Sequence, residues 1–264
     1  MSKRFETITE TLLPSGVLHA VLDRPAAANA INTQMGRDLL ALFSGLAAGD
    51  EHTRCVVLSG SGSRVFCAGG DLKERSGMTD QQWQAQHKIF EDAFRAVIDC
   101  PVPVLAAVNG AAFGGGLELA LACDIIYAAE TARFALTEVT LGIMPGCGGT
   151  QNLPRAIGER RAKDLILTGT SFTAAQAAEW GLVNQVWPVD ELVHETLKIA
   201  ERIASNAPLS VRQAKLSISR GLEMTLANGM LFEIQAYNRL VGTDDRREGI
   251  AAFNEKRKPT FKGS

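Results

Sequence analysis

The chain has 264 residues, of which 46% are hydrophobic and 21% charged, a balance typical of a folded globular protein. Its formal net charge of −2 argues against a protein whose main partner is nucleic acid or an anionic membrane surface. No apolar run is long enough to cross a bilayer, and the segment Met1–Glu6 lacks the apolar core of a signal peptide. We therefore expect a cytoplasmic protein that does not enter the membrane.

Strand and helix patterns alternate in the first third of the chain. Residues 5–12 and 17–22 predict two strands joined by a turn of Pro-x-Gly composition, and residues 33–46 carry an apolar stripe at helical spacing. Residues 54–59 then predict a buried strand. A second strand fragment at residues 65–68 runs into a glycine turn that is again followed by a helical segment. The order of strand, turn and helix therefore recurs.

A second glycine turn is the most distinctive stretch of the sequence. The apolar run Pro103–Val108 predicts a buried strand, Gly114–Gly116 form the turn, and Leu117–Cys123 continue with strong helix formers. Glycines let a ligand approach the backbone, and the first amides of a helix have no partner within it and lie at its positive end. The turn could hold a negative charge, or it could merely allow tight packing. Glu118, set directly behind the glycines in an apolar helix, favours the first interpretation.

The remainder of the chain changes from strands to helices. Residues 124–128 and 133–136 predict two further strands, and residues 141–150 a loop too rich in glycine for regular structure. Six helical patterns follow, at residues 160–167, 173–180, 189–205, 208–220, 223–241 and 244–256. This order predicts an α/β core over residues 1–195, which contains the active site, and a C-terminal helical region over residues 196–264.

Cysteines and histidines give no sign of a metal centre. The five cysteines are odd in number, widely spaced and free of any C-x-x-C pair, so we expect them to be reduced. The four histidines are scattered without the spacing of metal ligands. We expect neither a metal nor a cofactor.

Short motifs occur along nearly the whole chain in a fixed order: Leu22–Pro25, Phe66–Glu74, Ala107–Gly110, Gly114–Glu118, Phe134–Gly142, Pro145–Thr150, Gly181–Val183 and Ala252–Arg257. In this order they resemble the enoyl-CoA hydratase/isomerase, or crotonase, superfamily. The resemblance implies a crotonase-like spiral of ββα repeats with a C-terminal helical region used in trimer formation. It also implies a homotrimer or a dimer of trimers, with an acyl-CoA thioester as substrate.

The resemblance also implies a role for each of five residues. The backbone amides of Gly70 and Gly115 would hold the thioester oxygen, on which enolate charge builds during the reaction. Glu118 would orient and deprotonate the attacking water and Glu138 would supply the proton to Cα, a pair of acid/base groups that suffices without a metal. Gly146 matches a glycine whose backbone lies near the catalytic water.

Further positions match the channel for coenzyme A, namely Arg24, Ala30, Ala68, Leu72 and Lys73. Family members often have a lysine directly after the Arg-Pro pair, where this chain has Ala26, so Arg24 is the only basic candidate nearby for a phosphate. Residues 79–98 predict an amphipathic helix, and its part around residues 83–94 is expected to cover the acyl end of the substrate.

Several functions are compatible with the motifs. We expect an enoyl-CoA hydratase, which needs both glutamates. A Δ3,Δ2-enoyl-CoA isomerase needs only one carboxylate, and Glu118 argues against it because that branch commonly lacks a glutamate there. The stretches Asp71–Arg75 and Asp245–Gly249 resemble methylglutaconyl-CoA hydratases, so a branched or acidic acyl group is an alternative.

An RNA-binding module is the alternative from a different class, because that branch includes proteins described as binding RNA. Affinity for nucleic acid depends mainly on basic residues that contact phosphates. The predicted helix at residues 33–48 has a single basic residue, Arg37, so we expect no nucleic-acid partner.

Overall fold

The computed structural model describes residues 4–50 and 52–264, so part of the segment on which the signal-peptide prediction rests lies outside the described residues. The strands form two sheets. The larger sheet contains, in spatial order, β1 (Ile8–Leu12), β2 (Val17–Leu22), β3 (Cys55–Gly60), β5 (Val104–Val108), β7 (Ile125–Ala129) and β10 (Gln185–Trp187). The smaller sheet contains β4 (Val65–Cys67), β6 (Ala111–Phe113), β8 (Arg133–Ala135) and β9 (Phe172–Thr173). All neighbouring strands are parallel except the pairs β1/β2 and β8/β9.

The chain alternates between the two sheets. From β3 onward, a long strand of the larger sheet is followed by a short strand of the smaller sheet and then by helical structure. The helical segments that follow β4, β6 and β8 are α2 (Leu72–Arg75) with α3 (Asp80–Ile98), α4 (Gly115–Ala122), and η2 (Glu138–Leu141) with α5 (Gly149–Ile157) and α6 (Glu159–Thr168). This arrangement is the predicted α/β spiral of ββα repeats.

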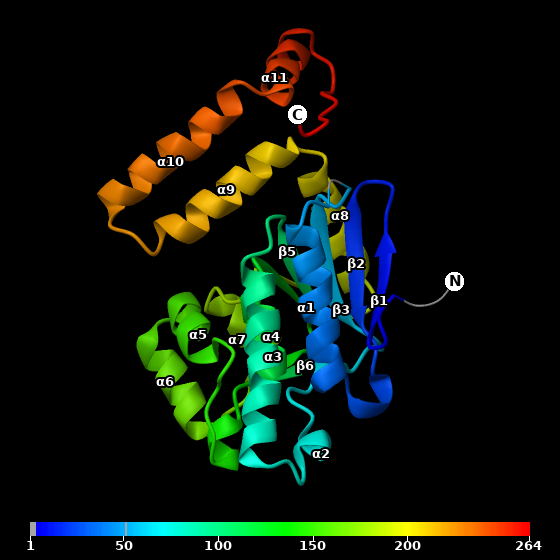
Figure 1. The fold of residues 1–264 in the computed structure, drawn as a ribbon, viewed down its shortest axis with the longest axis vertical. Helices are drawn as coiled ribbons and strands as arrows, with labels where there is room; N and C mark the ends of the chain where they lie inside the picture. The colour runs from blue at the N-terminus through cyan, green and yellow to red at the C-terminus, as the bar shows by residue number, and fades with distance from the viewer. Residues whose placement is uncertain (1–3, 51) are drawn as a thin grey trace.

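Two long helices pack side by side against the core (Figure 1). Helix α1 (Thr33–Ala47) begins where the Asn32 side chain accepts a hydrogen bond from the Met35 N–H, and α3 begins at a capping box formed by Thr79 and Gln82. They meet closely at Gly36, where a Cβ atom would lie 2.7 Å from the Phe90 ring, and both bury apolar side chains such as Leu39 and Phe94. Burial of this stripe, more than intrinsic propensity, stabilises both helices.

The core ends later than the sequence predicted. Helix α8 (Leu192–Ala204) packs against β2, β3, β5 and β7, so the expected division between residues 195 and 196 falls inside a helix that belongs to the core. After Ala204 the chain forms the hairpin of α9 (Pro208–Gly221) and α10 (Leu226–Val241), which stands away from the core in Figure 1. Helix α11 (Asp244–Asn254) follows near the C-terminus.

The α9–α10 hairpin exposes apolar side chains. Lys215 attaches it to the core through an ion pair with Asp124 at 2.7 Å. Its exposed large apolar residues are Ile218, Leu222, Met224, Leu226, Met230, Leu231, Ile234, Tyr237 and Val241. None of the helices in the described ranges combines the length and hydropathy needed to cross a membrane. An exposed apolar surface of this kind marks an interaction site.

Several short elements were not predicted. The sequence indicated that the strand ending at Val108 passes directly through a glycine turn into a helix, whereas β6 lies between them and belongs to the other sheet. Helix α5 begins at Gly149, inside the segment expected to be a loop. Strands β9 and β10 and the short helix η1 (Pro25–Ala27) were also missed, whereas α7 (Ala174–Glu179) lies within the helix predicted at residues 173–180.

Candidate active site

Three neighbouring parallel strands of the smaller sheet end at the same edge. β4, β6 and β8 pair in this order, so their carboxyl ends lie side by side. Gly69 and Gly70 follow β4, Gly114 and Gly115 follow β6, and Glu138 lies three residues beyond the end of β8. Segments far apart in sequence are thereby brought to one place.

The two glycine turns lie against each other. Gly69 has φ +94° and Gly114 has φ +52°, backbone conformations that residues other than glycine rarely adopt. A Cβ atom on Gly69 would lie 2.8 Å from the Phe113 carbonyl oxygen, and one on Gly115 would lie 3.7 Å from the Gly70 nitrogen. Neither the Gly70 nor the Gly115 N–H donates a hydrogen bond within the described part of the chain. Two adjacent amides therefore remain available to one acceptor.

Glu118 is held in place by backbone amides. It lies in the first turn of α4 and is only 3% exposed. Its Oε1 accepts hydrogen bonds from the N–H groups of Cys147, at 2.7 Å, and Gly149, at 2.8 Å. Because Gly149 is the first residue of α5, the carboxylate lies at the positive end of that helix.

Burial dominates the acidity of Glu118. It raises the pKa to about 7, although the bonds from Gly149 and Cys147 lower it, and the charge of Glu138 raises it further. At neutral pH the group is therefore close to the midpoint of its titration.

Glu138 has different surroundings. It begins η2 and is 9% exposed, and burial raises the pKa of its carboxyl. A Cβ atom on Gly114 would lie 3.0 Å from Glu138 Oε1, so this carboxyl lies against the second glycine turn. Its Oε2 is buried and has no hydrogen-bond partner among the residues that the structure describes. This oxygen can bond to a bound molecule instead.

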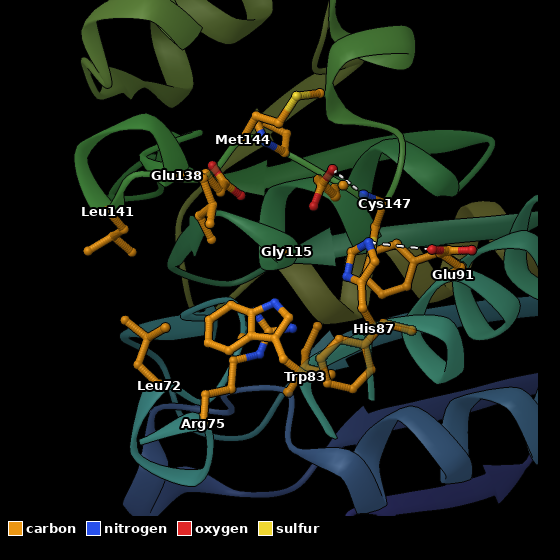
Figure 2. A pocket seen from close by; sticks show the side chains of 18 of the residues that line it. Leu72, Arg75, Trp83, His87, Glu91, Gly115, Glu138, Leu141, Met144 and Cys147 are labelled. Atoms are coloured by element: carbon orange, nitrogen blue, oxygen red, sulfur yellow. Dashed lines mark hydrogen bonds and ion pairs between the residues drawn. The ribbon is translucent and has the colours of Figure 1, made fainter. Parts of the chain in front are cut away.

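The two carboxyl groups and the two free amides belong to residues that line one cavity of about 530 Å³ (Figure 2). Both glutamates and both glycines with free amides contribute to its wall, as do Gly146, Ala68 and Leu72 from the sequence prediction. The apolar part of the wall comes from Ile31, Phe90, Phe94, Leu141, Ile143, Met144 and Pro145. The cavity thus combines an apolar interior with two carboxyl groups and two free amides. No cluster of three or more potential metal-ligating His, Cys, Asp or Glu residues occurs in residues 4–50 and 52–264.

Three residues predicted to bind coenzyme A lie elsewhere in the described structure. Arg24 Nη2 forms an ion pair with Asp71 at 3.0 Å, and its Nη1 donates a hydrogen bond to the Ala30 carbonyl. These bonds connect the segment after β2 to the start of α2. Ala30 is buried, and Lys73 is exposed on α2. None of these three side chains lines the cavity.

Polar residues that the sequence did not single out also line the cavity. The helix expected over the acyl end supplies Trp83 and His87, and His87 Nε2 lies 3.6 Å from a Glu91 carboxylate oxygen. Arg75 lies on the same side as Trp83, and Cys147 and Met144 lie on other parts of the wall (Figure 2). Their positions depend on how α3 and the loop before α5 pack, which no local pattern indicates.

Comparisons with known proteins give one family for this chain. Residues 13–264 match the family model described as enoyl-CoA hydratase/isomerase. The enoyl-CoA isomerase/hydratase fer4 of Mycosarcoma maydis is 43% identical over 256 residues, which cover 94% of this chain and 93% of that protein. The mitochondrial enoyl-CoA hydratase domain-containing protein 2 of Mus musculus is 42% identical over 252 residues, covering 94% of this chain and 85% of that protein.

A solved structure is also similar. The crystal structure of enoyl-CoA hydratase from Bacillus anthracis superposes with a TM-score of 0.96 at 44% identity, covering 98% of this chain and 100% of that chain. Sequence and fold therefore agree over almost the full length. The chain belongs to the enoyl-CoA hydratase/isomerase, or crotonase, superfamily.

Proposed function

We propose that the protein is an enoyl-CoA hydratase, which adds water across the C2–C3 double bond of a 2-enoyl-CoA thioester to give a 3-hydroxyacyl-CoA. The observation that carries the proposal is the meeting of two buried carboxyl groups, Glu118 and Glu138, with the free amides of Gly70 and Gly115 on one cavity. Each part of this set matches one requirement of the reaction.

The two amides would bind the thioester carbonyl oxygen. As water attacks C3, the electron pair of the double bond moves toward the thioester and builds negative charge on this oxygen. Donors that are already in place need not reorganise, and each typically lowers the barrier by about 3 kcal/mol. The start of α4 at Gly115 adds a favourable partial charge.

The two carboxyl groups would move the protons. Glu118, in its ionised form, takes a proton from water while the hydroxide oxygen bonds to C3, and Glu138, in its protonated form, gives a proton to C2. Burial raises the pKa of the Glu138 carboxyl, and its buried Oε2 has no hydrogen-bond partner among the described residues, which leaves that oxygen available for the proton transfer. The hydrogen bonds from Cys147 and Gly149 fix the direction of Glu118. One water is consumed, and a later proton exchange restores both groups.

Isomerisation is the nearest competing reaction, because fer4 carries both activities in its name. Moving a double bond requires one carboxylate to carry a proton between two carbons. A second carboxyl group, buried and bonded by two amides as Glu118 is, has no task in that reaction. This favours hydration.

The α9–α10 hairpin supports an oligomer. Its exposed apolar residues would be covered in a homotrimer or a dimer of trimers, the assemblies that the family resemblance implies. The chemistry proposed here uses acyl-CoA as substrate and needs neither metal nor cofactor. The cytoplasmic location remains a prediction, since the mouse relative is named as mitochondrial.

The test is hydration of a panel of 2-enoyl-CoA thioesters, measured as loss of the conjugated absorbance. We expect Glu118→Gln and Glu138→Gln each to lower kcat at least about 1,000-fold, because each removes a proton-transfer group. Binding of a saturated acyl-CoA should persist in both variants. Glu159→Gln, at an exposed position on α6, is the matched control and should retain full activity.

Two results would contradict the proposal. Full double-bond migration activity in Glu118→Gln, with no hydration by the wild type, would identify an isomerase. Tight RNA binding without turnover of any thioester would identify a binding protein instead.

A further inference from the structure

Arg75 holds a fixed position in the cavity wall. Its Cζ lies 4.2 Å from the centre of the Trp83 ring and 5.4 Å from that of Phe90, so both rings contact the guanidinium. Its Nε donates a hydrogen bond of 2.7 Å to Gln86 Oε1. Gln86 is fixed in turn, because its Nε2 donates to Glu74 Oε2 at 2.7 Å. The guanidinium is therefore held in place before any substrate binds.

The outer half of this guanidinium is free. Neither Nη1 nor Nη2 of Arg75 has a hydrogen-bond or ion-pair partner among the residues described by the structure. The carboxylate that lies closest in the chain, Glu74, is engaged by the Thr33 N–H and by Gln86. An arginine that only joined α2 to α3 would be expected to use these donors within the protein. They are available to a ligand instead.

The location of Arg75 limits which part of a substrate it can contact. A Cβ atom on Gly70 would lie 3.6 Å from both Cζ and Nη1 of Arg75. The guanidinium is thus next to the amide proposed to hold the thioester oxygen. Glu138 and Leu141 lie across the cavity from Leu72 and Arg75 in Figure 2. A group bound by Arg75 must therefore lie within a few atoms of the reacting carbons.

We propose that Arg75 binds a carboxylate carried by the acyl chain, so that the preferred substrate is a short 2-enoyl-CoA with an acidic end. A guanidinium with both outer nitrogens free can form two parallel hydrogen bonds with a carboxylate. The aromatic rings of Trp83 and Phe90 exclude water from one side and strengthen the pairing. This inference rests on the proposed hydratase function and adds its substrate class.

The test compares two thioesters of the same shape. Glutaconyl-CoA has a carboxylate at C5, and 5-methylhex-2-enoyl-CoA has an uncharged isopropyl group in the same place. The readout is the ratio of kcat/KM for the acidic substrate to that for the neutral one. Arg75→Met should lower this ratio about 100-fold, because it removes a charge-assisted pair of hydrogen bonds. Arg75→Lys should restore part of the ratio by returning the charge without the two-pronged geometry.

The control is Arg37→Met, which removes an exposed arginine from the neighbouring helix α1 and leaves the cavity unchanged. It should leave the ratio unaltered, which separates a direct contact from general attraction of an anionic substrate. The neutral substrate also reports whether Arg75→Met is folded.

Three outcomes would overturn the inference. Equal losses on both thioesters would mean that Arg75 supports the oxyanion and not the acyl end. Weaker binding of free CoA to Arg75→Met, measured by calorimetry, would assign the guanidinium to a phosphate. A wild type that hydrates the neutral thioester, with an unchanged ratio in Arg75→Met, would leave the hydratase standing without a carboxylate site. If the wild type hydrates neither, the proposed function itself fails.

Discussion

The two sides of the cavity present a glutamate in opposite ways. On one side, the Glu118 wall consists of Glu118 with the amides of Cys147 and Gly149, and both amides bond to the same carboxyl oxygen. On the other side, the Glu138 wall consists of Glu138 with Gly114, and one carboxyl oxygen is buried with no partner in the described residues. The protein thus fixes the direction of one acid and leaves the other with hydrogen-bonding capacity for reactants.

The comparison also shows that hydrogen bonds do not determine acidity by themselves. Glu118 accepts two amide bonds, which favour its ionised form, yet burial raises its pKa to about 7. Folding must therefore place a carboxyl where its charged form is poorly solvated. We therefore expect the position of Glu118 to cost stability, as is common for residues placed for function.

The largest effect that we expect on protein stability concerns Glu118, whose charged form is poorly solvated. Glu118→Gln should stabilise the protein at neutral and higher pH, because glutamine retains an oxygen for the Cys147 and Gly149 amides but cannot ionise. The carboxyl titrates at 4.5 when unfolded and at about 7 when folded. Wild type and variant should be alike below pH 4.5, diverge as pH rises from 4.5 to 7, and differ above pH 7 by on the order of 3 kcal/mol.

Urea unfolding of both proteins at several pH values between 4 and 8.5 measures this difference. A difference that stays constant over the whole range would show that the folded carboxyl titrates normally. In that case burial would not perturb the acidity of Glu118, and the two walls would differ only in their hydrogen bonds.

Glycines provide a matched pair of tests, one for each wall. A Cβ atom on Gly149 would lie 3.0 Å from Glu118 Oε1, and one on Gly114 would lie 3.0 Å from Glu138 Oε1. Displacing either carboxyl should lower kcat about 100-fold, since misplacement by about 1 Å has effects of that size. Gly114→Ala should also lose about 1–3 kcal/mol of stability, because its φ is +52°.

Hydration kinetics and thermal unfolding of the two variants check both statements. Gly45→Ala, within α1, is the control and should retain activity. An unchanged stability of Gly114→Ala would mean that the distinct backbone conformation of Gly114 is irrelevant.

The smallest effect concerns the loop that supplies the Glu118 wall. A Cβ atom on Gly146 would lie 2.6 Å from His87 Cε1, so the imidazole packs directly on this loop. His87→Ala should loosen the loop and lower kcat by about tenfold or less, while the Glu138 wall is untouched. The exposed His194→Ala on α8 is the control. A loss as large as that of Gly149→Ala would assign His87 a more direct part.

The sequence placed the main site residues because their order along the chain is distinctive. Gly70, Gly115, Glu118 and Glu138 all prove to line one cavity. Strand β6 was missed because three residues are too few to show an alternating pattern, although this strand determines where Gly115 lies. The convergence of the site thus depends on elements too short to detect.

Basic residues were the hardest to assign. That Arg24 lies near a phosphate stays a prediction; in the structure its guanidinium pairs with Asp71, 47 positions later. Arg75 lies in a matching motif without any indication of its task. Its free donors become evident only when Trp83 and Gln86 on α3 are seen to hold it. The partner of each arginine therefore depends on long-range packing, which no local sequence pattern shows.

The proposed oxyanion donors are main-chain atoms, and this affects how mutations can reach them. No single-codon change deletes a backbone N–H unless it introduces proline. At Gly70 a Cβ atom would meet nothing closer than 3.6 Å, so a small side chain can replace the glycine and leave the donor intact. At Gly114 the same change strains the chain. Saturation mutagenesis should therefore find that small side chains are tolerated at Gly70, whereas almost no substitution is tolerated at the nearby Gly114.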